Sequence, residues 1–123
     1  EQVELSTTEL KKIFRLAAAG IYIEMFSEGI DAVWHDMLAD QAAYEQFSKD
    51  ASGQVIGHGQ TSGTGLVSFV QAYERRYGKL PRIWFHDANG VFDQNRYNEY
   101  LLTGNIISGW VCNPTHNCAV VVV

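Results

Sequence analysis

Histidines are the side chains of this 123-residue chain best able to exchange protons near neutral pH, and four are present. His86 is the preferred candidate, because it shares a strand face with Trp84 in the expected strand 82–88 and is followed by the carboxylate of Asp87. An inward His86 would line a pocket and, with Asp87, move a proton; an outward His86 is an equal alternative. The remaining histidines are expected on a helix surface, in a glycine-rich loop and in the last turn: His35, His58 and His116.

Tyr22 is the candidate donor to a substrate, because it lies close to the apolar side of the expected first helix. Its hydroxyl would either polarise a substrate carbonyl or hydroxyl, or satisfy a buried acceptor in a purely structural role. Two polar side chains would orient the ligand by hydrogen bonding, and three aromatic side chains would form the pocket walls. These substrate-binding candidates are Tyr44, Gln46, Trp34, Phe69 and Trp84.

Neither a metal nor a cofactor is expected from the motifs. A transition metal needs two or three histidines or carboxylates at helix or strand spacing, whereas the adjacent pairs His35–Asp36 and His86–Asp87 have diverging side chains. The glycine-rich stretch 57–65 resembles a phosphate-binding loop but lacks the Walker lysine. The two cysteines, Cys112 and Cys118, either form a disulfide or remain as half-buried thiols.

Composition limits the classes of partner. A net charge of -5 argues against nucleic acid or an anionic membrane, because both attract basic surfaces. No apolar run approaches the roughly 18 residues that a membrane span needs. At 46% hydrophobic residues, the chain is expected to form one domain over 1–123. No signal segment is visible, so a cytoplasmic location is favoured.

Helices are expected in the first two thirds of the chain. A capping box from Ser6 to Glu9 and an apolar residue every third or fourth position predict a helix over 7–28, which Gly29 would end. Further helices are predicted over 32–38 and 65–77. Alternation predicts a half-buried strand over 42–47, with Tyr44 and Gln46 on one face, and a short strand follows at 54–57.

The last third is predicted to be β-structure. Asn89–Gly90 favours a type I′ hairpin turn between strands 82–88 and 91–94. Further strands are expected over 99–103, 106–112 and 118–123. The resulting α+β order would place the helices on one face of an antiparallel sheet.

The order of long helix, glycine, short helix, "LADQAAYEQF" strand and "GQTSGTGLVSFVQAYERRYGKLP" helix resembles the NTF2-like superfamily, particularly its ketosteroid isomerase and SnoaL-like polyketide cyclase branch. The resemblance covers about residues 8–81. It implies an NTF2-like cone, in which three helices from the N-terminal half pack in a curved, mostly antiparallel β-sheet. It also implies an apolar pocket and frequent dimerisation.

The resemblance places Tyr22 where the steroid isomerases keep an oxyanion-hole tyrosine, and Gln46 where they keep the aspartate base. Classical ketosteroid isomerase activity is therefore not expected, because an amide cannot abstract a proton from carbon near neutral pH. The neighbouring Glu45 would point to the opposite face of the strand.

The sequence thus favours a small-molecule pocket protein, either a cofactor-independent lyase, cyclase or isomerase or a non-catalytic module. The enzyme would act on an apolar cyclic molecule of polyketide, terpenoid or steroid type. The non-catalytic alternative is a ligand-binding or protein-interaction domain, of the immunity or scaffold kind. The β-branched segments 106–107 and 120–123 favour a homodimer across the sheet.

Overall fold

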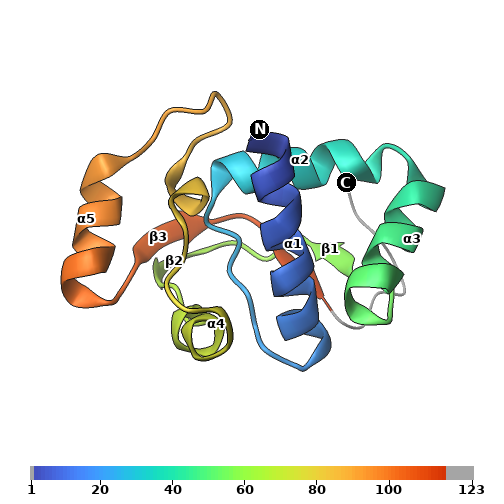
Figure 1. The fold of residues 1–123 in the computed structure, drawn as a ribbon, viewed down its shortest axis with the longest axis horizontal. Helices are drawn as coiled ribbons and strands as arrows, with labels where there is room; N and C mark the ends of the chain where they lie inside the picture. Colours follow the sequence, from blue (N-terminus) through green and yellow to red (C-terminus); the bar gives the residue numbers. More distant parts are fainter. Residues whose placement is uncertain (1, 116–123) are drawn as a thin grey trace.

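The computed structural model describes residues 2–115 of the chain, which form an α+β fold. Figure 1 shows one helix, α1, at the centre, with α2 and α3 on one side of it and α4 and α5 on the other. The helices are α1 (Gln2–Ala18), α2 (Glu28–Leu38), α3 (Gln41–Ser52), α4 (Val70–Tyr77), the 3-10 helix η1 (Arg82–Phe85) and α5 (Gln94–Thr103). The strands are β1 (Gly57–Gly59), β2 (Gly63–Leu66), β3 (Ile107–Trp110) and β4 (Asn113–Thr115).

The strands of residues 2–115 form two separate antiparallel pairs, β1 with β4 and β2 with β3. In the first pair His58 lies opposite Pro114, and in the second Leu66 lies opposite Ile107. The curved sheet that the NTF2-like resemblance implies is therefore not formed by the described strands. The two short pairs are connected by the chain, because only residues 111–112 separate β3 from β4. Figure 1 shows β3 between α5 and α1.

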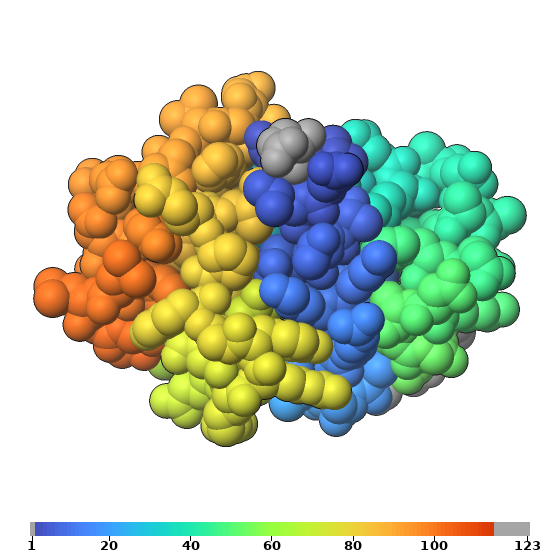
Figure 2. Space-filling view, in the orientation of Figure 1, coloured from blue at the N-terminus to red at the C-terminus, as the bar shows by residue number. Residues whose placement is uncertain are grey.

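The core surrounds α1, because the helix has apolar residues on the sides that face its neighbours. Leu10, Ile13 and Phe14 are fully buried, and Phe14 contacts the aromatic rings of Trp34 and Tyr44. Figure 2 shows α1 lying between the α2–α3 side and the α4–η1 side of the molecule on this face. None of the helices among residues 2–115 is long and apolar enough to cross a membrane.

The first helix is shorter than predicted, since it ends at Ala18 rather than near residue 28. Gly20 has φ +92° and starts an extended segment that leads to α2. Ile21 and Met25 fit both a four-residue helical step and the two-residue alternation of extended chain, so periodicity alone could not locate the end. The second helix begins at Glu28 instead of residue 32, with Ser27 as its N-cap.

The predicted strand 42–47 is wrong, because this segment belongs to α3. Asp40 caps the helix by accepting a hydrogen bond from the amide of Ala43 at 3.1 Å, and the buried Tyr44, Ser48 and Ala51 recur at helical steps. The alternation of Tyr44 with its neighbours covers too few residues to distinguish the two periods.

The predicted β-structure of the last third is also largely wrong. Residues 99–103 lie in α5, which Asp93 caps through the amide of Arg96. Residues 82–85 form η1, so the hairpin is reduced to one bridge, between His86 and Phe92, around a turn at Gly90. The strand predicted over 54–57 is observed later in the chain, as β1, and the helix predicted over 65–77 is shorter, as α4. The strand predicted over 106–112 contains β3. The strand predicted over 118–123 lies outside the described residues.

Candidate metal centre

Helix α2 places Asp31 and His35 on the same face, one turn apart. Ser27 starts the helix by accepting a hydrogen bond from the amide of Ile30 at 3.2 Å, so Asp31 lies in its first turn. The i, i+4 spacing brings Nε2 of His35 to 3.4 Å from Oδ2 of Asp31. Both side chains are partly exposed, at 20% for Asp31 and 39% for His35.

His58 reaches the same carboxylate from β1. Its side chain is only 2% exposed, and the centroid of its ring lies 4.4 Å from the ring centroids of both Trp34 and His35. Nε2 of His58 is 3.6 Å from Oδ1 of Asp31, which is longer than a hydrogen bond. Among residues 2–115, neither ring nitrogen has a hydrogen-bond partner. A buried imidazole in this state is destabilising unless another group binds it.

Asp31, His35 and His58 are spaced as ligands of one metal ion. One potential ligand atom of each lies within 4.8 Å of those of the other two. Two nitrogen or oxygen ligands on a tetrahedral zinc ion are about 3.4 Å apart, given bond lengths of about 2.1 Å. Nε2 of His35 is 3.4 Å from Oδ2 of Asp31 and Nε2 of His58 is 3.6 Å from Oδ1, so each imidazole is near this separation from one of the two carboxylate oxygens.

Cys112 contacts the carboxylate as well. It is a buried side chain immediately before β4 that forms no disulfide within residues 2–115, and its Sγ donates to Oδ1 of Asp31 at 3.1 Å. Burial raises the pKa of this thiol, and the hydrogen bond and negative charge of Asp31 raise it further. The disulfide considered from sequence involves Cys118, which lies outside the described residues.

The pKa of Asp31 results from opposing effects. Burial acts to raise it, whereas the interactions with His58 and Cys112 and the positive charge available on His35 act to lower it, and together they outweigh burial. The pKa of Asp31 is therefore below its usual value, and the carboxylate is the form that the site stabilises.

Asp31 also borders a cleft of about 550 Å³, which continues toward a cavity of about 360 Å³. The two spaces share four lining residues: Phe26, Ser27, Glu28 and Arg96. The cleft is further lined by hydroxyl groups and an indole, from Ser62, Thr64, Ser108 and Trp110. A small molecule in this cleft would lie next to the carboxylate of Asp31.

Three of the predicted site residues come together, at the smaller cavity. His86, Asp87 and Trp84 line it, and Nδ1 of His86 is buried without a hydrogen-bond partner among the residues that the structure describes. Asp87 has a structural task there, because its Oδ1 accepts hydrogen bonds from the amides of Asn89 and Val91. Of these three residues, only His86 has a side-chain nitrogen that makes no hydrogen bond to the described part of the chain, so only His86 offers a nitrogen to a ligand in the cavity.

The other predicted site residues line neither space. Tyr22 is 45% exposed in the extended segment after α1, which does not suit the role of polarising a substrate. Gln46 is on the exposed face of α3 and donates to Asp50. Tyr44 accepts from Trp34 and donates to the carbonyl of Ile56 in the core. Phe69 is fully buried against Phe26 and Trp84.

Sequence reasoning did not find the cluster of Asp31, His35 and His58. Its readable signal was the Asp-x-x-x-His spacing on a helix, which puts both side chains on one face. Pairing His35 with its neighbour Asp36 instead hid this spacing. His58 joins the cluster only through the tertiary fold, so no local pattern could have revealed it.

Comparison with known proteins adds no assignment: no family model matches the chain, and neither a curated protein nor a solved structure matches it.

Proposed function

We propose that this protein binds a divalent transition-metal ion of the zinc class through Asp31, His35 and His58. The proposal rests on the environment of His58: this 2%-exposed imidazole makes no hydrogen bond within the described part of the chain, and it lies beside a carboxylate and a second imidazole. A bound ion would use one of those nitrogens and offset the charge of Asp31. Two imidazoles and one carboxylate suit zinc or a neighbouring transition metal better than magnesium or calcium, which prefer oxygen ligands.

The bound ion would link α2 to β1 at the wall of the 550 Å³ cleft. Asp31 and His35 come from the helix, whereas His58 comes from a strand of only three residues. Metal binding therefore stabilises this wall, and with it the surface that a small molecule in the cleft would contact.

Thermal unfolding with and without zinc tests the proposal. Zinc at about 100 times its dissociation constant adds roughly 2.7 kcal/mol to the free energy of unfolding. We expect the resulting rise in Tm in the natural chain, and its loss in Asp31→Ala and His58→Asn. Asp36→Ala, which removes an exposed carboxylate from the same helix, should keep the full rise. Equal rises in all four proteins would refute the assigned ligands.

A second candidate function is supported by His86. Its buried, unpartnered Nδ1 at the 360 Å³ cavity favours an acid–base role in the cofactor-independent lyase, cyclase or isomerase expected from sequence, acting on an apolar cyclic molecule. A non-catalytic ligand-binding role is the alternative. This candidate does not depend on the NTF2-like cone. Screening cyclic ketones for turnover tests it: His86→Gln should abolish turnover, whereas turnover unchanged in that variant would exclude the role.

The homodimer expected from sequence remains a proposal. Leu66 and Ile107 lie opposite each other on the outer face of β2 and β3 and are 57% and 67% exposed. Val111 nearby is 66% exposed. A second copy of the chain covering this face would remove these side chains from water. Sedimentation at micromolar concentration should then give a dimer, and a monomer would contradict it.

A further inference from the structure

We infer that Cys112 is the fourth ligand of the metal centre and coordinates the ion as a thiolate. This inference rests on the proposed binding of a transition metal by Asp31, His35 and His58. Cys112 is not part of the three-ligand cluster. Its coordination would decide whether the ion keeps an open position for a substrate.

The backbone of Cys112 is fixed next to His58. β4 starts at the following residue and pairs with β1, so that His58 lies opposite Pro114. On its other side, the carbonyl of Cys112 accepts a hydrogen bond from the amide of Met25 at 3.1 Å. With its main chain held between two segments and its side chain 1% exposed, the thiol has little freedom to turn away from Asp31.

The distance from Sγ of Cys112 to Asp31 is close to the separation of two ligands on one ion. Sγ lies 3.1 Å from Oδ1 of Asp31, whereas a thiolate and a carboxylate oxygen on tetrahedral zinc are about 3.6 Å apart. The separation of the sulfur from this oxygen is therefore about 0.5 Å shorter than in a coordinated pair, and metal binding would move the sulfur toward the ion. The S–H bond breaks, the zinc–sulfur bond forms, and the proton is released to solvent, so no oxidant or reductant is required.

A second observation independent of the cysteine points to an ion at this place. His58 is buried and neither of its ring nitrogens makes a hydrogen bond to any described residue, although Nε2 approaches the same oxygen of Asp31 that Cys112 contacts. The groups that approach Asp31 thus bring together its carboxylate, a thiol and two imidazoles. This set has the composition of a four-coordinate zinc site, in which sulfur also favours zinc, cobalt or cadmium over harder ions.

Four protein ligands would give a closed coordination sphere, which is typical of a structural rather than a catalytic zinc. The ion would join α2, β1 and the segment leading into β4. The β1–β4 pair contains only three residue pairs, and an isolated pair of strands is marginally stable in water. Chemistry in the neighbouring cleft would then depend on other side chains.

Cobalt substitution tests the inference, because a Co²⁺ ion bound by a thiolate shows an intense sulfur-to-metal charge-transfer band in the near ultraviolet. The metal-free full chain, kept reduced, is titrated with Co²⁺ and its spectrum is recorded. We expect the band to reach its maximum at one ion per chain in the natural protein and in Cys118→Ser, and to be absent in Cys112→Ser.

The possible outcomes separate the two proposals. Saturable Co²⁺ binding with visible bands but without the charge-transfer band would overturn the role of Cys112 and leave the other three ligands in place. No Co²⁺ binding at all would refute the metal centre itself. A band that persists in Cys112→Ser but disappears in Cys118→Ser would show that Cys118 supplies the sulfur ligand, and it would overturn the role of Cys112. If Cys112→Ser folds poorly, the spectra of the natural chain and of Cys118→Ser decide: a band in both supports Cys112, and a band lost in Cys118→Ser refutes it.

Discussion

At the residue scale, Asp31 is the side chain around which the site forms. His35 reaches one carboxylate oxygen, while His58 and Cys112 approach the other. All three of these neighbours carry atoms that can themselves bind a transition metal. Asp31 also contacts the cleft, so the same residue connects metal binding with the space available to a ligand.

Gly63 provides a test of how the cleft wall packs. A Cβ at this position would lie 2.7 Å from Cζ2 of Trp110, the residue opposite it on β3. We therefore expect Gly63→Ala to displace the indole and reduce the free energy of unfolding by about 1–3 kcal/mol, measured by urea denaturation. Gly109→Ala is the control, because its new Cβ would approach nothing closer than 3.6 Å. Equal stabilities of the two variants would show that Trp110 does not pack as described.

At the scale of elements, Glu9 joins three helices. This carboxylate of α1 is 3% exposed and accepts hydrogen bonds from Tyr73 of α4, from Nε1 of Trp84 of η1 at 2.9 Å, and from Lys12 at 3.0 Å. Hydrogen bonds to a buried charge contribute more than neutral ones, because the charged partner polarises the donor. Glu9 thus holds the α4–η1 side of the molecule to the central helix.

Glu9→Gln should lower the free energy of unfolding by about 2–3 kcal/mol, since it removes the charge and replaces one acceptor oxygen by a donor amide. Chemical denaturation at neutral pH measures the loss. Glu4→Gln is the matched change, because Glu4 is exposed on the same helix, and its effect should stay within about 0.5 kcal/mol. A loss no larger in Glu9→Gln than in Glu4→Gln would contradict the role given to this carboxylate.

Sequence patterns predicted some elements because caps and periodicity agreed. For α2, Trp34 and Leu38 form a buried pair one turn apart, and the helix was expected there. For α3, the cap at Asp40 was a readable signal that a short alternation around Tyr44 obscured. The strands β1 and β2 are glycine-rich and lack apolar alternation, so only their distant partners define them.

The candidate site was predictable only in part, for a related reason. Asp31 and His35 are a local pair, whereas His58 and Cys112 arrive through the pairing of β1 with β4. His86 was expected to line a cavity and does so, but Tyr22 was placed by a helix that ends before it. Local periodicity gives no information on such long-range pairing.

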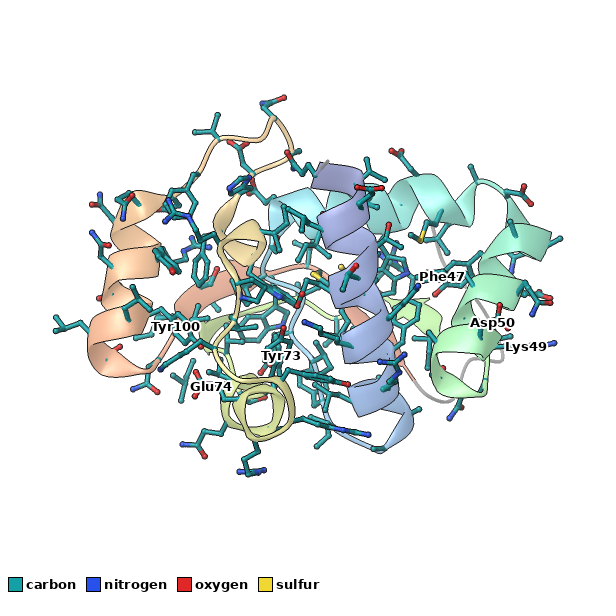
Figure 3. The ribbon with its side chains drawn as sticks, in the orientation of Figure 1. Phe47, Lys49, Asp50, Tyr73, Glu74 and Tyr100 are labelled. Atoms are coloured by element: carbon teal, nitrogen blue, oxygen red, sulfur yellow. The ribbon has the colours of Figure 1, made fainter. Side chains whose placement is uncertain are left out.

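At the scale of the whole molecule, buried tyrosines make stability sensitive to alkaline pH. Figure 3 shows Tyr73 and Tyr100 near the α4 end of the core, with Glu74 beside Tyr100. Burial raises the pKa of Tyr73, and its hydrogen bond to Glu9 raises it further. Burial likewise raises the pKa of Tyr100, together with its hydrogen bond to Glu74. Both hydroxyls are therefore held neutral in the folded chain.

The sign of the pH effect follows from the unfolded chain, where tyrosine has a pKa of about 10. Below this value the tyrosine contribution to stability is complete, and above it the unfolded chain loses protons that the folded chain retains. We expect the urea midpoint to fall from about pH 10 upward, and to fall less steeply in Tyr73→Phe. Identical pH profiles for the natural chain and Tyr73→Phe would contradict the assignment.

The central claim is that one transition-metal ion binds between α2 and β1. Calorimetric titration of the metal-free chain with Zn²⁺ at neutral pH tests it most directly. The predicted result is saturation at one ion per chain, with affinity reduced more than about 100-fold in His58→Asn, because loss of a direct ligand exceeds the effect of an outer-shell change. Absence of binding, or binding that His58→Asn leaves unchanged, would contradict the claim.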